Sequence, residues 1–253
     1  MKKFFELGQV CVIISTMGTV DKPDIVRQTI IINDDYVKKN RRADGKVGLV
    51  LGRADKDNKR VFVNEFVIDK NISLLSGPEI EDLKQRINRV DVGDVVAHES
   101  QHIHNGAIGY HYLANADNIY ECMMLGLADE MSAMIAGYMH KTNDINKAMD
   151  LVEKNMSGII RQGYIKGQFA NNFKRLQNTW GNDKNLFEYK YDTKKINKVL
   201  KWYFNINGQD VMRQMNDATR FKFAAIVQNF KNEIKDFVDK YQMMQRMGEY
   251  QKG

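Results

Sequence analysis

The stretch VVAHESQHIHN, residues 95–105, lies where the sequence changes from short β-branched segments to long helical ones. Three of the chain's five histidines occur in it, and His98 and His102 bracket Glu99 in the pattern His-Glu-x-x-His. For this composition, chance would supply roughly 0.004 such matches. The stretch therefore indicates both where the architecture changes and where a functional site is expected.

The spacing of this pattern suits a metal site on a helix. Residues four apart lie one turn apart on the same face, so His98 and His102 can bind one ion. Glu99 leans toward the open coordination position, where it can take a proton from a metal-bound water. At about 100° per residue, the same face also carries small or polar residues that leave room for a metal and a substrate, namely Asp94, Asn105 and Gly109.

The other nearby histidines do not share this face. We expect His104 at the surface or beside the ligands, and His111 as a hydrogen-bonded packing residue. A third ligand must therefore come from elsewhere, because catalytic zinc takes three protein ligands and keeps one position open.

The next helical segment offers three acidic candidates, Glu121, Asp129 and Glu130. Glu121 and Glu130 are nine residues apart, on opposite sides of a straight helix, so they cannot bind the same ion. We favour Glu130, because a carboxylate inside the apolar LADEMSAMIAGY is costly to bury unless it coordinates a metal. Glu121, expected to serve the helix N-terminus, and Asp129, able to orient a histidine, stay open as alternatives. Small residues near the Glu130 face would allow close approach to the histidine helix: Gly126, Ala133 and Gly137.

Residues 1–75 are expected to be extended. Four short segments rich in β-branched residues are separated by turn-forming polar stretches, over residues 10–16, 25–33, 46–52 and 60–68. The N-terminus also has the charged start and apolar run of a secretory signal, but Glu6 interrupts the run, and we favour a buried strand there.

From Pro78 onward the pattern is helical almost to the end of the chain. Helices are expected over residues 78–90 and through the histidine stretch, then, with a cap at Asp117 or Asn118, over 118–140, 143–163, 192–204 and 217–247. The predicted fold class is α+β, with a short N-terminal twisted sheet, an active-site helix and a mainly helical C-terminal half. We expect an α/β metal-binding part over residues 1–142 and a helical part over 143–253, which can belong to the same domain.

Charge is unevenly distributed, with a net −3 for residues 1–140 and +9 for residues 141–253. The basic residues of the second part are scattered singly, which is more typical of a solvated helical face than of a nucleic-acid site, so no nucleic-acid partner is expected. Hydrophobic residues make up 43% of the chain, as in ordinary globular proteins, and no apolar run is long enough to predict a transmembrane segment.

At this point the chain resembles a known group of enzymes. His98, Glu99 and His102, followed by Glu130 in the segment DEMSA of the next helix, resemble the zincin metallopeptidases, and within them the gluzincins, whose third ligand is a glutamate. The resemblance spans residues 94–140. It implies a Zn²⁺-dependent peptidase with a twisted sheet before the active-site helix, an edge strand that aligns a peptide or protein substrate, and a helical part that closes the cleft.

The sequence departs from the thermolysin-like pattern, which has an aspartate four residues after the third ligand, because Met134 follows Glu130 at that spacing. Tyr138 and His140 are candidates for the group that stabilises the oxyanion, although core packing for Tyr138 and helix capping for His140 are simpler interpretations. The alternative function is a catalytically inactive zincin-like protein that binds partners or plays a structural role through its basic helical half.

Overall fold

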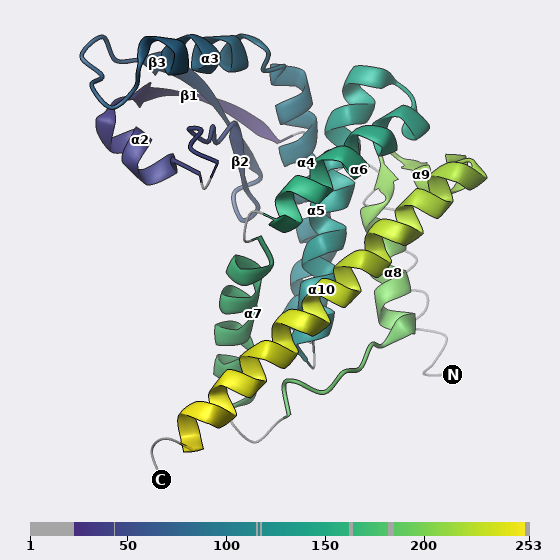
Figure 1. The fold of residues 1–253 in the computed structure, drawn as a ribbon. Coiled ribbons are helices and arrows are strands. Elements are labelled where there is room, and N and C mark those ends of the chain that lie inside the picture. The colour runs from purple at the N-terminus through teal and green to yellow at the C-terminus, as the bar shows by residue number, and fades with distance from the viewer. Residues whose placement is uncertain are drawn as a thin grey trace.

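The chain is an α+β protein with small sheets and mostly helical content (Figure 1), which confirms the coarse fold class. The computed structural model describes residues 23–250, apart from residues 43, 115, 117, 162–163 and 182–184. Side chains are also left undescribed at residues 110–114, 157–161, 164 and 245–250.

The N-terminal sheet has three strands, β1 (Asp24–Ile32), β2 (Gly52–Asp55) and β3 (Arg60–Ile68), in the order β1-β3-β2. β1 pairs with β3 in parallel, whereas β2 and β3 form an antiparallel pair joined by a tight turn. The predicted strands over residues 25–33 and 60–68 are thereby confirmed, and their β-branched residues are typical of strands.

Two expectations for this region were wrong. Residues 46–52 do not form a strand, because Gly48 N donates to Asn40 O instead of a neighbouring strand, and β2 begins only at Gly52. Helix α2 (Asp34–Asn40) replaces an expected turn, and Asn33 caps it by accepting a hydrogen bond from Tyr36 N. The strand predicted over residues 10–16 lies outside the described residues.

Helices pack against both faces of strand β3, whereas Ile25 and Ile31 of β1 and Val67 of β3 are exposed. On one face, α2 and α3 (Gly77–Asn88) bury a small cluster that includes Ile32, Val37 and Leu83. On the other, Val61 and Val63 of β3 pack against α4 (Val92–Ala114), the helix that carries the histidine motif. Because neighbouring strand residues point to opposite faces, β3 contributes to both clusters.

Helix α5 (Ile119–Thr142) lies at the centre of the larger core and is buried on nearly all sides along its first five turns. Asn118 caps it, as predicted, by accepting a hydrogen bond from Glu121 N. An element buried all round has no polar face, which explains its run of methionines. The remaining elements follow in the order α6 (Ile145–Arg161), α7 (Tyr164–Trp180), α8 (Thr193–Tyr203), β4 (Asn205–Ile206), β5 (Gln209–Asp210), α9 (Val211–Gln214) and α10 (Asp217–Tyr250).

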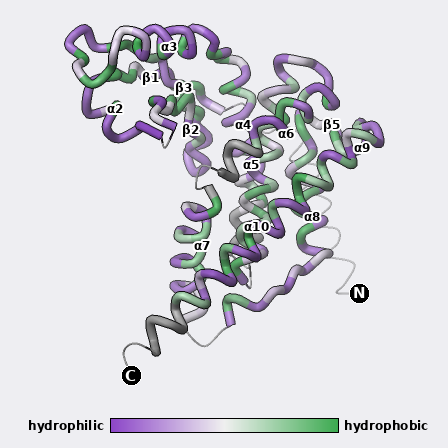
Figure 2. Tube along the Cα trace, viewed as in Figure 1, coloured by the Kyte–Doolittle hydropathy of each residue, from purple (hydrophilic) through white to green (hydrophobic). Residues whose placement is uncertain are grey.

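The long C-terminal helix α10 covers this core. It buries Ile226, Phe230, Ile234 and Val238, four residues apart, and hydrophobic and hydrophilic residues alternate along it (Figure 2). The core joins α5 to elements from α6 to α10, so it runs across residue 142, where we predicted a division. The division of the chain into a metal-binding part over residues 1–142 and a helical part over residues 143–253 stays a prediction. In the described part of the chain, no helix has the length and apolar character needed to cross a bilayer.

The start of α3 gives a pH-dependent test of the fold. Glu79 Oε2 accepts hydrogen bonds from Ser76 N (2.8 Å) and Ser76 Oγ (2.7 Å), and Arg41 lies 3.1 Å from its other oxygen. These bonds lower the pKa of Glu79 from 4.5 to about 2. Because the folded pKa is the lower one, the stabilisation is complete above about pH 4.5 and is lost as the pH falls toward 2.

We therefore expect Glu79→Gln to lower the thermal midpoint at pH 7, with the difference from the parent shrinking as the pH falls from 4.5 toward 2. Thermal unfolding followed by circular dichroism over this range measures it. Glu81→Gln removes the same charge from the same helix and is the matched control. A difference in thermal midpoint between Glu79→Gln and the parent that stays constant with pH would contradict the role of the Glu79 carboxylate at the start of α3.

Candidate metal centre

Helix α4 presents the histidine motif as the sequence predicted. Asp91 Oδ1 accepts a hydrogen bond from Gly93 N at 2.8 Å and so caps the start of the helix. One turn apart on a shared face, His98 Nε2 and His102 Nε2 approach to 3.2 Å. Both rings therefore point the same nitrogen atom at one location.

Glu130 of α5 completes the group. Its Oε1 lies 3.7 Å from His98 Nε2, and its Oε2 lies 3.6 Å from His102 Nε2. One potential ligand atom from each residue lies within 4.8 Å of the other two. Donors bound to tetrahedral zinc at about 2.0–2.1 Å would be separated by roughly 3.3–3.4 Å. The Nε2–Nε2 separation of 3.2 Å is close to that value, the Glu130 carboxylate approaches each ring to within 3.7 Å, and the two-nitrogen, one-carboxylate donor set suits zinc, so the residues fit the expected ion.

The fit depends on a close approach of α5 to α4. A Cβ atom on Gly137 would lie 3.0 Å from Asp94 O and 3.4 Å from His98 Cβ, so only glycine allows this spacing without adjustment. The expected role of Gly137 is confirmed. Gly126, for which we expected the same role, instead faces Gln168 of α7, whose Oε1 would lie 3.5 Å from its Cβ.

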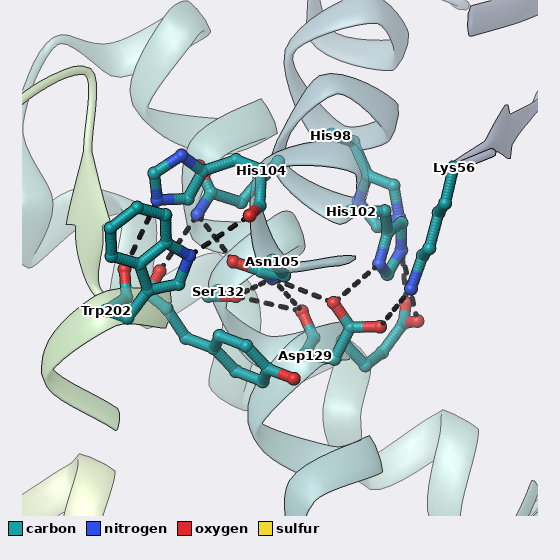
Figure 3. Close-up of polar contacts among 11 residues, drawn as sticks. Lys56, His98, His102, His104, Asn105, Asp129, Ser132 and Trp202 are labelled. Atoms are coloured by element: carbon teal, nitrogen blue, oxygen red, sulfur yellow. Dashed lines mark hydrogen bonds and ion pairs between the residues drawn. The ribbon is translucent and has the colours of Figure 1, made fainter. Parts of the chain in front are cut away.

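Asp129 lies next to His102 and faces its Nδ1 atom (Figure 3). Its Oδ1 is 3.0 Å from His102 Nδ1, a buried atom whose N–H direction departs from ideal hydrogen-bond geometry, and it accepts a 2.8 Å hydrogen bond from Asn105 Nδ2. Lys56 Nζ lies 3.0 Å from Oδ2. An acceptor at Nδ1 favours the tautomer that leaves the Nε2 lone pair free for a metal.

The acidities in this group follow from burial and from neighbouring charges. Burial and the nearby His102 lower the pKa of His98 to about 3, which keeps the ring neutral, as a ligand must be. Burial would lower the pKa of His102 too, but its contact with Asp129 outweighs burial and raises it. Burial opposes ionisation of Asp129, yet its bonds to His102 and Asn105 and the charge of Lys56 lower its pKa to about 2.

Glu99, the predicted general base, is half-buried on α4 beside strand β2. A Cβ atom on Gly52 would lie 2.7 Å from Val95 Cγ1 and 3.1 Å from Glu99 Cγ, so β2 packs directly against this part of the helix. Burial, together with the charge of Glu130, raises the pKa of Glu99. A carboxyl whose pKa is raised toward neutrality is better suited to accept and return a proton.

The structure does not bring Glu121 into this group. It is 2% exposed and pairs with Lys195 of α8 at 2.9 Å, while also accepting a hydrogen bond from Asp192 N. Its expected role at the helix N-terminus was therefore incomplete, because its carboxylate ties α5 to α8. His104 stacks on Trp202 with ring centroids 4.5 Å apart, beside the candidate ligands but not among them. The side chain of His111 lies outside the described residues.

Tyr138 and His140 were the candidates for stabilising the oxyanion, and neither belongs to the group formed by His98, His102 and Glu130. Tyr138 Oη accepts a hydrogen bond from Asn155 Nδ2 and packs against the larger core, as the simpler interpretation held. His140 lies 3.3 Å from Asp94, and Asn143 rather than His140 caps the end of α5. Asp91, Asp94 and His140 also lie within 4.8 Å of one another, but Asp91 already serves as the cap of α4.

Lys56 is the residue of this site that the sequence did not indicate. It stands in the polar stretch ADKDNK, which shows only a turn, and nothing in its spacing relates it to His102 or Asp129. Asn105, in contrast, was expected on the face of His98 and His102, and it contacts both Asp129 and Ser132.

Comparisons of the chain with protein-family models, with curated proteins and with solved structures found no match. The assignment of a function therefore depends on the arrangement of these residues.

The identity of the third ligand can be tested with two glutamate variants. Glu130→Ala is expected to remove a ligand and lower the zinc content from about one per chain to well below one. Glu121→Ala is expected to keep the zinc but to lower the free energy of unfolding by about 3–5 kcal/mol, because it removes the buried carboxylate that pairs with Lys195 and accepts a hydrogen bond from Asp192 N. Elemental analysis and urea unfolding measure the two effects. Zinc loss in Glu121→Ala without zinc loss in Glu130→Ala would reverse the assignment.

Proposed function

We propose that this protein is a zinc-dependent metallopeptidase of the zincin type, with a glutamate as third ligand. The observation that carries the proposal is the convergence of His98 Nε2, His102 Nε2 and a Glu130 carboxylate oxygen, with Glu99 on the same helix between the histidines. This donor set supplies three protein ligands, which is typical of catalytic rather than structural zinc. The order of a small sheet, a motif helix and a second helix with the glutamate is consistent with a zincin-like architecture.

In this proposal His98, His102 and Glu130 hold the ion, and bound zinc would lower the pKa of a water and polarise the scissile carbonyl. Glu99 takes the proton from the attacking water and returns it to the leaving amine. Its raised pKa serves both steps, because the base must be ionised before attack and protonated afterwards. Asp129 keeps His102 in the tautomer that can bind metal.

The β2 strand supports a peptide as the substrate class. It is an edge strand of the described sheet, paired with β3 on one side, and Gly52 packs it against Glu99. An edge strand can pair with an extended peptide through backbone hydrogen bonds, which would hold the peptide alongside the candidate site.

The role of Glu99 can be tested by a conservative substitution. Glu99→Gln keeps the size of the side chain and removes its basicity, so the rate of hydrolysis of labelled casein is expected to fall about 10²–10⁴-fold. The zinc content should stay at the parent value, since Glu99 is not a proposed ligand. A rate assay and elemental analysis on the same preparation give both results.

Two outcomes would count against the proposal in different ways. A Glu99→Gln variant that hydrolyses casein at the parent rate would contradict the role of Glu99 as the general base. A parent protein that binds zinc but hydrolyses neither casein nor a peptide library supports the alternative, a zincin-like binding or structural protein.

A further inference from the structure

Lys56 reaches the candidate metal centre from the sheet. It follows β2 directly, and its side chain lies across α4 at Gly106, where an added Cβ would be 3.0 Å from Lys56 Cδ and 3.3 Å from Lys56 Cβ. Gly106 is one turn beyond His102, so a larger residue there would obstruct this path. Figure 3 shows the Lys56 side chain running from the strand side past His102 toward Asp129.

The ammonium group meets Asp129 in a sheltered position. The Nζ–Oδ2 distance is 3.0 Å, and the two side chains are 26% and 19% exposed, so the pair is screened less than a surface salt bridge. Asp129 is thereby engaged on both sides, with a bond from Lys56 at Oδ2, a bond from Asn105 at Oδ1, and His102 Nδ1 at 3.0 Å from Oδ1. Both oxygens are engaged away from the position shared by His98, His102 and Glu130.

Three carboxylates lie near this position, which is more than a catalytic zinc ion binds. Glu130 is the proposed ligand and Glu99 the proposed base, while Asp129 is the neighbour of Glu130 in sequence and a strong ligand type in its own right. With the three carboxyls ionised, their charge of −3 is reduced to −2 by Lys56, which a divalent ion balances. Without Lys56, Oδ2 of Asp129 would lose its cationic partner, and the carboxylate would be held at Oδ1 alone.

We propose that Lys56 is a positioning residue that keeps Asp129 as the partner of His102 and out of the coordination shell of the metal, so that one coordination position stays open for water and substrate. This inference rests on the proposed zinc site. It predicts that loss of the Lys56 charge leaves metal binding intact but changes the coordination and the activity.

The test uses Co²⁺ alone as the probe, because its visible absorption is stronger in four-coordinate than in more highly coordinated sites. Lys56→Met, which has no positive charge, is expected to bind Co²⁺ at least as tightly as the parent, with weaker visible absorption and casein hydrolysis reduced about 10–100-fold. Lys56→Arg keeps the charge and should keep the parent spectrum. Lys70→Met removes an exposed lysine after β3 and is the control for net charge.

A double-mutant cycle with Asp129→Asn tests whether Lys56 acts through Asp129. An amide is a poorer ligand than a carboxylate, so in the Asp129→Asn background Lys56→Met should change neither the Co²⁺ spectrum nor the affinity further. A further change in that background would mean that Lys56 acts by another route and would overturn the inference.

The remaining outcomes separate this inference from the proposed function. A Lys56→Met protein with the parent spectrum and activity, or one that no longer binds Co²⁺, contradicts the role of Lys56 while the metal site stands. A parent protein that binds no Co²⁺ contradicts the metal site itself.

Discussion

The close packing of α4 against α5 is the constraint on which the candidate site depends. The histidines lie on one helix and Glu130 on the other, so their atoms meet only if the two backbones approach closely. Gly137 permits this, because its missing side chain lets Asp94 O and His98 Cβ occupy the space next to α5. Since α5 is also the centre of the larger core, the position of Glu130 is fixed by the packing of the whole helical part.

A chain of buried polar groups extends this constraint to the C-terminal half. Gln101 donates to Tyr203 O of α8 and to Asn105 Oδ1, and Asn105 donates to Asp129, which faces His102. Gln101 and Asn105 are buried, so each would be costly without these bonds. The orientation of one candidate metal ligand is thus connected to a helix a hundred residues later in the chain. This makes the basic C-terminal half part of the support of the site.

The N-terminal sheet contributes from the opposite side. β2 lies against Glu99 at Gly52, and the turn that follows it brings Lys56 to Asp129. The sheet therefore places a backbone edge and a positive charge beside the carboxylates. In a group that contains Glu99, Asp129 and Glu130, a cation is needed to limit mutual repulsion, and burial makes its effect larger than at the surface. The three regions of the chain meet at one site, each with a different chemical contribution.

The sequence by itself predicted most of the helices from Pro78 onward, though not α7, and it placed His98, His102 and Glu99 on one helix and favoured Glu130 over Glu121. These follow from periodicity and spacing along a single helix, which are local properties. It did not determine the irregular path of residues 46–52 or helix α2, since short apolar segments fit several backbone conformations equally well.

Only the tertiary structure decided which side chains complete the site. Asp129 is the partner of His102 because α5 packs against α4 with the face that carries Asp129. Lys56 contacts Asp129 although 73 residues separate the two. Glu121 pairs with Lys195 through the packing of α8, which no spacing within α5 could show. A helix specifies the residues on its own faces, whereas contacts between elements depend on how all of their surfaces pack together.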